Sequence, residues 1–333
     1  MNGSAVAPWI VAQVTTLLAQ NGHAWLLAGP SGMGQYSLAL ALARAWLCDQ
    51  PSALGACNQC ASCHAVDVRT HADLYVLMPE TAMLALGWPL GEGAQTEIDD
   101  KKRKASKEIR IEAMRDAVEF CQRTGARARG KAILVFPAER MNAVAANALL
   151  KTLEEPAGDV RFVMASEAAH QLMPTIRSRC LTHAMAWPRP QAALAWLQAQ
   201  GVDPAQAQVM LRAAGGRAQD ALEFYQAGSS AQLWVDLPKA MARGDLSLLK
   251  DWSPAQTVDA LQKICHDVLA LKTGAAPRFF AAVDLPAGGD LTGLTQWSRA
   301  LSATRRTVEH PFNMGLMIEA LVSQAKNALN STH

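Results

Sequence analysis

One segment of the chain has the glycine spacing of a loop that binds phosphate. In the motif G-x-x-x-x-G-K-[ST], backbone N–H groups surround phosphate oxygens, and the Lys and Ser/Thr side chains contact the terminal phosphates and Mg²⁺. Here the segment runs from Gly29 to Tyr36 with its second glycine at Gly34, but Gln35 replaces the Lys and Tyr36 replaces the Ser/Thr. A neutral amide cannot offset phosphate charge, and a tyrosine is too long for the Mg²⁺ position. The spacing predicts a phosphate loop that has lost its chemistry, although by itself it also fits a glycine-rich turn.

A second element of such a site is also altered. Nucleotide hydrolysis needs carboxylates that hold Mg²⁺ and orient water. They would follow the apolar run Lys131–Val135, where the sequence has Phe136 and Pro137. Neither side chain can bind a cation. Because two separate positions lack the required residue types, we expect this chain to bind no ATP and to have no hydrolytic activity of its own.

Four cysteines have the spacing of a metal site. Two residues separate Cys57 from Cys60 and Cys60 from Cys63, and Cys48 lies nine positions before Cys57. Four thiolates complete a tetrahedral structural zinc site, and C-x-x-C spacing lets two sulfurs reach one ion. We predict structural Zn²⁺ here; the alternatives are a redox pair, an iron–sulfur cluster, or His64 replacing one cysteine. The isolated cysteines are predicted to be structural: Cys121, Cys180 and Cys265.

The elements that would position these residues alternate between strand and helix in the first half of the chain. The predicted strands are His23–Ala28, Ala72–Leu77, Lys131–Phe136, Val160–Ser166 and Cys180–Ala186. The clearest predicted helices are Gln35–Leu47, Ile109–Gln122 and Ala143–Glu155. Asn142 is a good N-cap for the last of them, and Pro156 ends it. This alternation indicates crossover units and a parallel sheet covered on both faces.

Two regions depart from that alternation. Residues 87–107 are rich in glycine and charge and predict a mobile surface loop. Its basic run, Lys101–Lys104, could contact DNA or a partner, but a solvated loop is the simpler interpretation. After Pro188 the strand signals fade and helical patterns follow, with a predicted hinge at Gly228–Ser230. These patterns are Ala192–Gln200, Pro204–Ala214, Gln219–Gln226 and Leu233–Asn330.

Composition limits the function classes. The 333 residues suggest two or three domains, and a net charge of +2 does not demand direct DNA binding. Met1–Ile10 lacks a basic stretch followed by an apolar run, so we expect no signal peptide. The longest apolar-rich stretch, Leu38–Cys48, contains Arg44 and falls short of the roughly 20 residues of a membrane span. We therefore expect a cytoplasmic protein with reduced thiols and no membrane partner.

Two further motifs give the chain a family resemblance. The segment Asn147–Pro156, which reads N-A-L-L-K-T-L-E-E-P, and Ser178–Cys180, which reads S-R-C, are similar to the signatures of clamp-loader AAA+ subunits. The resemblance implies an α/β AAA+ P-loop fold with a parallel sheet and helices on both faces. It implies three domains: an AAA+ domain over 1–187 that contains a zinc module at 48–63 and the loop 87–107, a small helical lid over 188–228, and an all-α collar over 229–333 that joins subunits.

The resemblance gives three positions a role. The arginine of the S-R-C motif, Arg179, would project into the ATP site of a neighbouring subunit, where a guanidinium can bridge phosphate oxygens. The alternative is that Arg179 pairs with a carboxylate of its own chain. Ser166 matches the residue that senses the γ-phosphate in active members. The lid arginine of the family falls on Gln219, a third change from an active site, although Arg217 lies two residues away.

Within the family, these changes favour a subunit that does not hydrolyse ATP. The gamma/tau ATPase type shares the zinc module and the S-R-C motif but keeps an intact phosphate loop. The resemblance therefore implies a delta-prime-type subunit of bacterial DNA polymerase III. Together with gamma/tau and delta subunits, it would load the sliding clamp onto primed DNA during replication. The alternatives are an active clamp-loader ATPase of gamma/tau type and a zinc-dependent nucleic-acid binding module that uses Lys101–Lys104.

Overall fold

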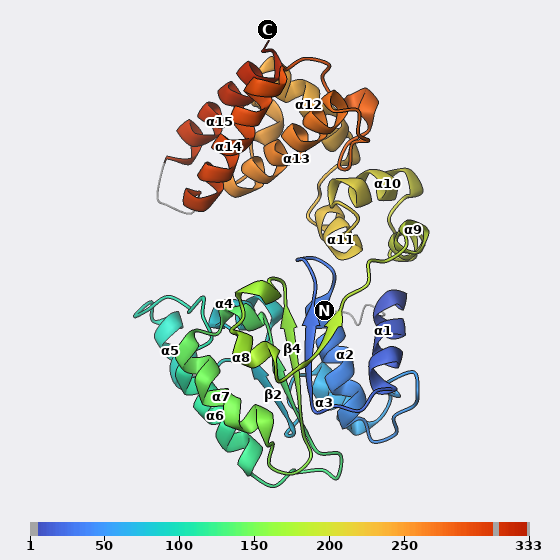
Figure 1. Ribbon diagram of the computed structural model, residues 1–333, viewed down its shortest axis with the longest axis vertical. Coiled ribbons are helices and arrows are strands. Elements are labelled where there is room, and N and C mark those ends of the chain that lie inside the picture. Colours follow the sequence, from blue (N-terminus) through green and yellow to red (C-terminus); the bar gives the residue numbers. More distant parts are fainter. Residues whose placement is uncertain (1–5, 309–312, 332–333) are drawn as a thin grey trace. The chain divides into compact units, whose positions relative to one another are not determined.

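The chain folds into two compact units. The computed structural model describes residues 6–308 and 313–331. The segment Met1–Ile10, for which we expect no signal peptide, is therefore described only from residue 6. Contacts divide the chain into residues 1–187 and 188–333, and both units are drawn in Figure 1. Within the described residues, no helix combines the length and apolar character that crossing a bilayer would need.

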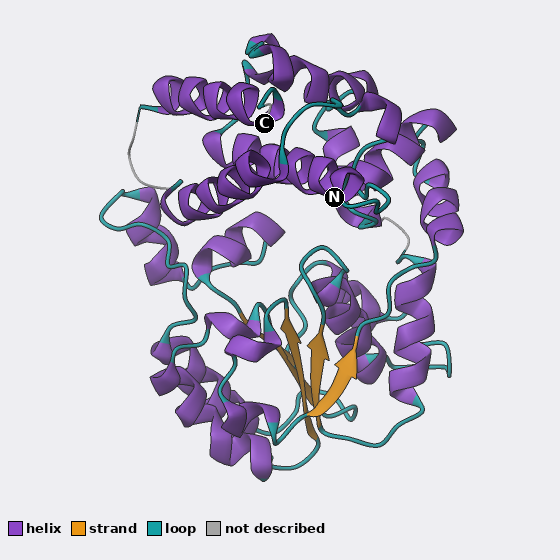
Figure 2. Ribbon diagram, turned by 45° about the horizontal axis from the view of Figure 1, so that its top comes forward, coloured by secondary structure: helices purple, strands orange, loops and turns teal. Residues whose placement is uncertain are grey.

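The first unit is built on a five-stranded sheet, drawn in orange in Figure 2. The strands are β1 (Ala24–Ala28), β2 (Leu74–Leu77), β3 (Lys131–Val135), β4 (Val160–Ser166) and β5 (Leu181–Ala184). Their order across the sheet is β2-β3-β4-β1-β5, and every neighbouring pair is parallel. The predicted parallel sheet is therefore confirmed, and the prediction erred only by one or two residues at some strand ends.

Helices cover both faces of this sheet (Figure 1). Of α1 (Pro8–Leu18), α2 (Gln35–Leu47) and α3 (Ala61–Asp67), α2 contacts β1, β3 and β4, while α1 and α3 contact α2. On the other face, α6 (Ile111–Gln122) and α7 (Ala143–Glu154) share a buried core with alternate strand residues such as Leu26, Ile133 and Phe162. Alternate residues of a strand point to opposite faces, so each strand contributes to two cores.

The start of α7 is set by its predicted cap. Asn142 Oδ1 accepts the backbone N–H of Ala145 at 2.9 Å, which satisfies one of the free donors of the first turn. Short segments flank the sheet ends: α8 (Pro174–Arg177) and the 3₁₀ turns η1 (Ala138–Arg140) and η2 (Ala169–Gln171). These segments carry the residues that the site depends on.

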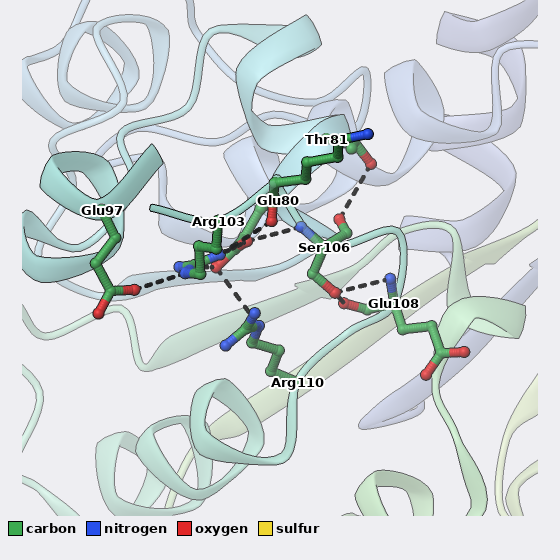
Figure 3. A network of polar contacts seen from close by, with 8 residues as sticks. Glu80, Thr81, Glu97, Arg103, Ser106, Glu108 and Arg110 are labelled. Carbon is green, nitrogen blue, oxygen red and sulfur yellow. Dashed lines mark hydrogen bonds and ion pairs between the residues drawn. The ribbon is translucent and has the colours of Figure 1, made fainter. Parts of the chain in front are cut away.

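The region predicted as a loop over 87–107 is partly helical, which corrects that prediction. After α4 (Glu80–Leu86), a second helix, α5, spans Glu92–Asp99. The chain that follows is tied down by Glu80, whose two carboxylate oxygens accept Arg103 Nη1 and Nη2 at 2.6 and 2.8 Å (Figure 3). Glu80 also accepts the backbone N–H of Ser106 at 2.8 Å, and Arg103 Nε donates to Glu97 at 2.6 Å. A charged side chain of the basic run is therefore held by its own chain.

We expect Glu80→Gln to loosen residues 100–110. Glu80 is 9% exposed, and hydrogen bonds to a charged group of this kind contribute about 1.5–3 kcal/mol. The hydrogen bonds from Arg103 lower the pKa of Glu80, so the stabilisation is complete above the carboxyl's unfolded pKa and is lost as pH falls through the folded value. The measurement is the rate of trypsin cleavage at Lys101–Lys104, which should rise in the variant.

Glu97→Gln is the matched control for this prediction. Glu97 contacts the same arginine, but 54% of its side chain is exposed, and exposed pairs contribute only about 0–1 kcal/mol. Its cleavage rate should stay close to that of the unaltered protein. Equal cleavage in the two variants would contradict a special role for Glu80.

All regular secondary structure in the described residues of the second unit is helical. Its helices are α9 (Pro190–Ala199), α10 (Pro204–Ala213), α11 (Ala218–Gln226), α12 (Ala231–Arg243), α13 (Pro254–Lys272), α14 (Leu291–Thr307) and α15 (Met314–Leu329), with 3₁₀ turns η3 (Ser247–Leu249) and η4 (Ala282–Asp284). Ala213 of α10 is buried in the same core as Leu237, Ile264 and Leu301. The segments predicted as lid and collar thus share one compact unit, and a domain boundary between them at residue 228 stays a prediction.

Candidate functional site: an altered phosphate loop, a cysteine cluster and a surface arginine

Gly29–Gly34 connects β1 to α2, and Gln35 and Tyr36 begin α2, which is the strand–loop–helix context of a phosphate loop. Gly34 is the N-cap of α2 and has a φ of 88°, a conformation that favours glycine. Gly29 lies so close to its surroundings that an added Cβ would come within 3.2 Å of Met33 Sδ. The backbone of the loop has therefore kept the shape that the glycine spacing predicts.

The side chain of Gln35 fills the inside of this loop. Its Nε2 donates to the carbonyl oxygens of Gly29 at 2.8 Å and Pro30 at 2.6 Å, and the residue is 2% exposed. In an active loop the Lys at this position reaches toward the phosphates. Here the amide turns back onto the loop's own backbone, and its two donors are both used. The loop is closed by its own neutral side chain.

The two sequence changes at the Mg²⁺ position lie in contact with each other. The ring centroids of Tyr36 and Phe136 are 5.6 Å apart. Trp88 Nε1 donates to the Tyr36 hydroxyl at 2.7 Å, and Arg69 lies over the Trp88 ring. Burial raises the pKa of Tyr36, so its hydroxyl stays neutral. An aromatic cluster thus occupies the place where an active site would hold the metal and its carboxylates.

Ser166, at the end of β4, is fully buried and hydrogen bonds to a carboxylate that is not among the predicted site residues. Its Oγ donates to Glu139 Oε2 at 2.8 Å, and the backbone N–H of Glu167 donates to the same carboxylate at 3.2 Å. Glu139 lies in η1, three residues beyond Phe136. No local signal marks it, because the contact joins residues 27 positions apart. The γ-phosphate-sensing role of Ser166 stays a prediction.

The four predicted cysteines lie together. Their ligand atoms are all within 4.8 Å of one another. The Sγ–Sγ distances are 3.8 Å for Cys48–Cys60, 3.9 Å for Cys57–Cys63 and 3.7 Å for Cys48–Cys63. Tetrahedral Zn²⁺ with bonds of about 2.3 Å needs sulfurs about 3.8 Å apart, so the donor set fits this ion.

The environment of the thiols suits a closed metal site. Backbone N–H groups of Gln59 and Cys60 lower the pKa of Cys57 to about 6, whereas burial raises the pKa of Cys63 to about 12. Burial also raises the pKa of Cys48. Metal binding must therefore displace protons from buried thiols, and affinity should fall at low pH. Such a site can hold structure together but offers no open position for chemistry.

A polar link connects this cysteine cluster to the edge of the sheet. Ser62 Oγ donates to Asp49 Oδ1 at 2.7 Å, and Arg127 Nη1 donates to Ser62 Oγ at 2.9 Å. The backbone N–H of Arg127 is in turn held by the buried Asp73 at 2.8 Å. Of the isolated cysteines, Cys121 and Cys265 are buried and Cys180 is partly buried. None of the three lies in the cluster.

Arg179 follows α8 and is bound by its own chain. Its Nε donates to Glu154 Oε1 at 2.6 Å, its Nη2 contacts the same oxygen, and its Nη1 donates to the carbonyl of Thr175 at 2.8 Å. The side chain is 31% exposed. The neighbouring Cys180 packs against the core of α6 and α7, and burial raises its pKa to about 12. Within the single chain, Arg179 therefore pairs with a carboxylate of its own chain, which is the predicted alternative to the finger role; a role in a neighbouring subunit stays a prediction.

Two further predicted residues lie outside this arrangement. Gln219 is on α11 of the second unit, and Arg217 beside it donates to Asp220 at 2.5 Å. In the basic run, Lys102 pairs with Asp100 at 2.8 Å. With Arg103 also paired, half of that run's cations contact acidic groups of the same chain, which weakens the interpretation of residues 101–104 as a nucleic-acid binding surface.

The fold and the loop define a class of protein. A parallel sheet of order β2-β3-β4-β1-β5, with a glycine-rich loop between β1 and α2, is an AAA+-like P-loop fold. A solved structure of a DNA polymerase III gamma subunit-related protein from Thermotoga maritima has this fold, with a TM-score of 0.50 and 14% identity, covering 96% of this chain and 99% of that one. At this identity the likeness concerns the fold alone.

Sequence comparison identifies the family. A family model described as "DNA polymerase III, delta subunit" matches residues 10–187, more than half of the 333 residues, and the chain belongs to this family. The Pseudomonas aeruginosa DNA polymerase III subunit delta' is 39% identical over 214 residues, 63% of this chain and 58% of the relative. The Escherichia coli subunit delta' is 31% identical over 241 residues, 71% and 65% of the two chains. The matched region spans less than two thirds of either relative.

Proposed function

We propose that this chain is a delta-prime-type subunit of a DNA polymerase III clamp loader that hydrolyses no ATP itself. It would assemble with gamma/tau and delta subunits, help to load the sliding clamp onto primed DNA, and contribute Arg179 to the ATP site of a neighbouring ATPase subunit. The 229–333 segment would act as the collar that joins subunits, and the cysteine cluster would hold structural Zn²⁺. Membership of the delta-subunit family supports this assignment.

The observation that carries the proposal is the closed phosphate loop. Gln35 donates both amide hydrogens to the loop's own carbonyls, at 2.8 and 2.6 Å. Opening the loop for a nucleotide would cost these hydrogen bonds and would still place a neutral group against the phosphates. Tyr36 and Phe136 fill the adjacent metal position. Because the changes act together on one site, reverting any single residue would not restore a working site.

The test is a calorimetric titration of the purified chain with Mg²⁺–ATP. We expect no binding heat at micromolar to submillimolar nucleotide and no release of phosphate. A gamma/tau-type subunit with an intact loop is the positive control under the same conditions. Micromolar binding accompanied by turnover would contradict the proposal and favour the active gamma/tau-type alternative.

A further inference from the structure

The contact between Arg179 and Glu154 joins the ends of two helices. Glu154 is the last residue of α7, and Arg179 lies two residues beyond α8. Arg179 Nε and Nη2 both contact Glu154 Oε1, and Nη1 donates to the carbonyl of Thr175 at 2.8 Å. Glu154 is 48% exposed and Arg179 is 31% exposed, so the pair lies at the surface.

These contacts occupy the edges that a guanidinium presents to phosphate. A guanidinium makes paired hydrogen bonds through its Nε–Nη2 edge or its Nη1–Nη2 edge. Glu154 uses the first edge completely, and Thr175 uses one nitrogen of the second. Carboxylate and phosphate oxygens accept from the same donors. Arg179 can therefore present its Nε–Nη2 edge to phosphate only if it first leaves Glu154.

We infer that Glu154 is a positioning residue. It holds Arg179 in an ion pair on its own chain and competes with the neighbouring subunit's nucleotide for the Arg179 guanidinium. This rests on the proposed role of Arg179 as an arginine finger. Since the pair is exposed, Glu154 competes only weakly, and the greater negative charge of Mg²⁺–ATP can displace it. Glu154 thus sets how readily the finger is released without taking part in the chemistry.

The test is Glu154→Gln in the complex reconstituted with the ATPase subunits. The amide keeps the size of the side chain but removes its charge. At subsaturating ATP we expect hydrolysis at the site that Arg179 completes to rise about two- to fivefold. An exposed ion pair contributes no more than about 1 kcal/mol, so its loss changes the availability of Arg179 by no more than about fivefold. Glu155→Gln is the matched control: the residue is adjacent and exposed, and its variant should hydrolyse ATP at the unaltered rate.

Two further measurements separate the possible failures. In the isolated chain, hydrogen exchange at Arg179 Nε, followed by NMR, should accelerate in Glu154→Gln but not in Glu155→Gln. Unchanged exchange, or a hydrolysis rate that is unchanged or lower in Glu154→Gln, overturns the inference while leaving the finger role intact. The double variant Glu154→Gln/Arg179→Ala should match Arg179→Ala. If Arg179→Ala itself leaves hydrolysis unchanged, the proposed finger fails, and this inference fails with it.

Discussion

Arg179→Ala should lower ATP hydrolysis at the one site that Arg179 completes by about 10³-fold, while this chain still folds and joins the complex. Arginine fingers in other nucleotide hydrolases contribute about 10³–10⁵ in rate, because they neutralise charge that develops on the transferred phosphoryl group. Within its own chain, Arg179 makes only a partly exposed pair with Glu154. Losing such a pair costs about 0–1 kcal/mol, so the unfolding temperature should change little.

The measurement is DNA-stimulated ATP hydrolysis by the reconstituted complex, with co-elution in size-exclusion chromatography as the check on assembly. If other ATPase sites remain active, the total rate of hydrolysis falls only by the fraction that the affected site contributes. Arg177→Ala is the matched control, since Arg177 is exposed and lies two residues away but outside the S-R-C motif. Normal hydrolysis with Arg179→Ala, or the same loss with Arg177→Ala, would contradict the assignment of Arg179.

Elements with a strong local pattern could be predicted from the sequence. The structure gives the helix Gln35–Leu47 and the strand Val160–Ser166 the predicted bounds, because a glycine precedes each element and apolar residues recur within it. The helix α1 was not predicted. Its N-cap, Ala7, offers no capping side chain, and Thr15 and Thr16 favour other conformations. The helix α5 (Glu92–Asp99) lies in a region predicted as loop, because no apolar stripe marks it. The chain that follows α5 is fixed by Arg103, which binds Glu80 and Glu97.

The features of the site that depend on residues close in sequence could also be predicted, whereas its contacts between distant residues could not. The glycine spacing and the cysteine spacing predicted the shape of the loop and the cluster of sulfurs because each depends on residues close in sequence. The hydrogen-bond partners of the site residues lie far away along the chain: Trp88 is 52 residues from Tyr36, and Glu154 is 25 residues from Arg179. Such pairs follow from how distant segments pack together in the fold, and a single sequence does not reveal them.

If the four cysteines hold the proposed Zn²⁺, removing it should unfold the region around them. Structural Zn²⁺ binds zinc-finger peptides with about 10–16 kcal/mol, which is comparable with the whole stability of an ordinary domain. Cys48 directly follows α2, the helix that begins at the altered phosphate loop, and Cys63 lies in α3. The module contributes few other large buried groups, so the metal would supply most of what holds it. We therefore expect Cys63→Ser, or treatment with a chelator, to lower the unfolding temperature strongly and to unfold the segment 48–68 locally.

Metal content and hydrogen exchange check this prediction together. Elemental analysis should give one zinc per chain in the unaltered protein and much less in Cys63→Ser, with exchange accelerated in residues 48–68 and unchanged in the helices of the second unit. Cys265→Ser is the matched control, because that buried thiol lies outside the cluster and its Sγ contacts the carbonyl of Leu294 at 3.4 Å, a bond that a hydroxyl can replace. It should retain its zinc. Stoichiometric iron with visible absorbance would instead support the iron–sulfur alternative. A metal-free chain with slow exchange over 48–68 would show that the hydrogen-bonded thiols, Ser62 and Asp49 hold the module unaided.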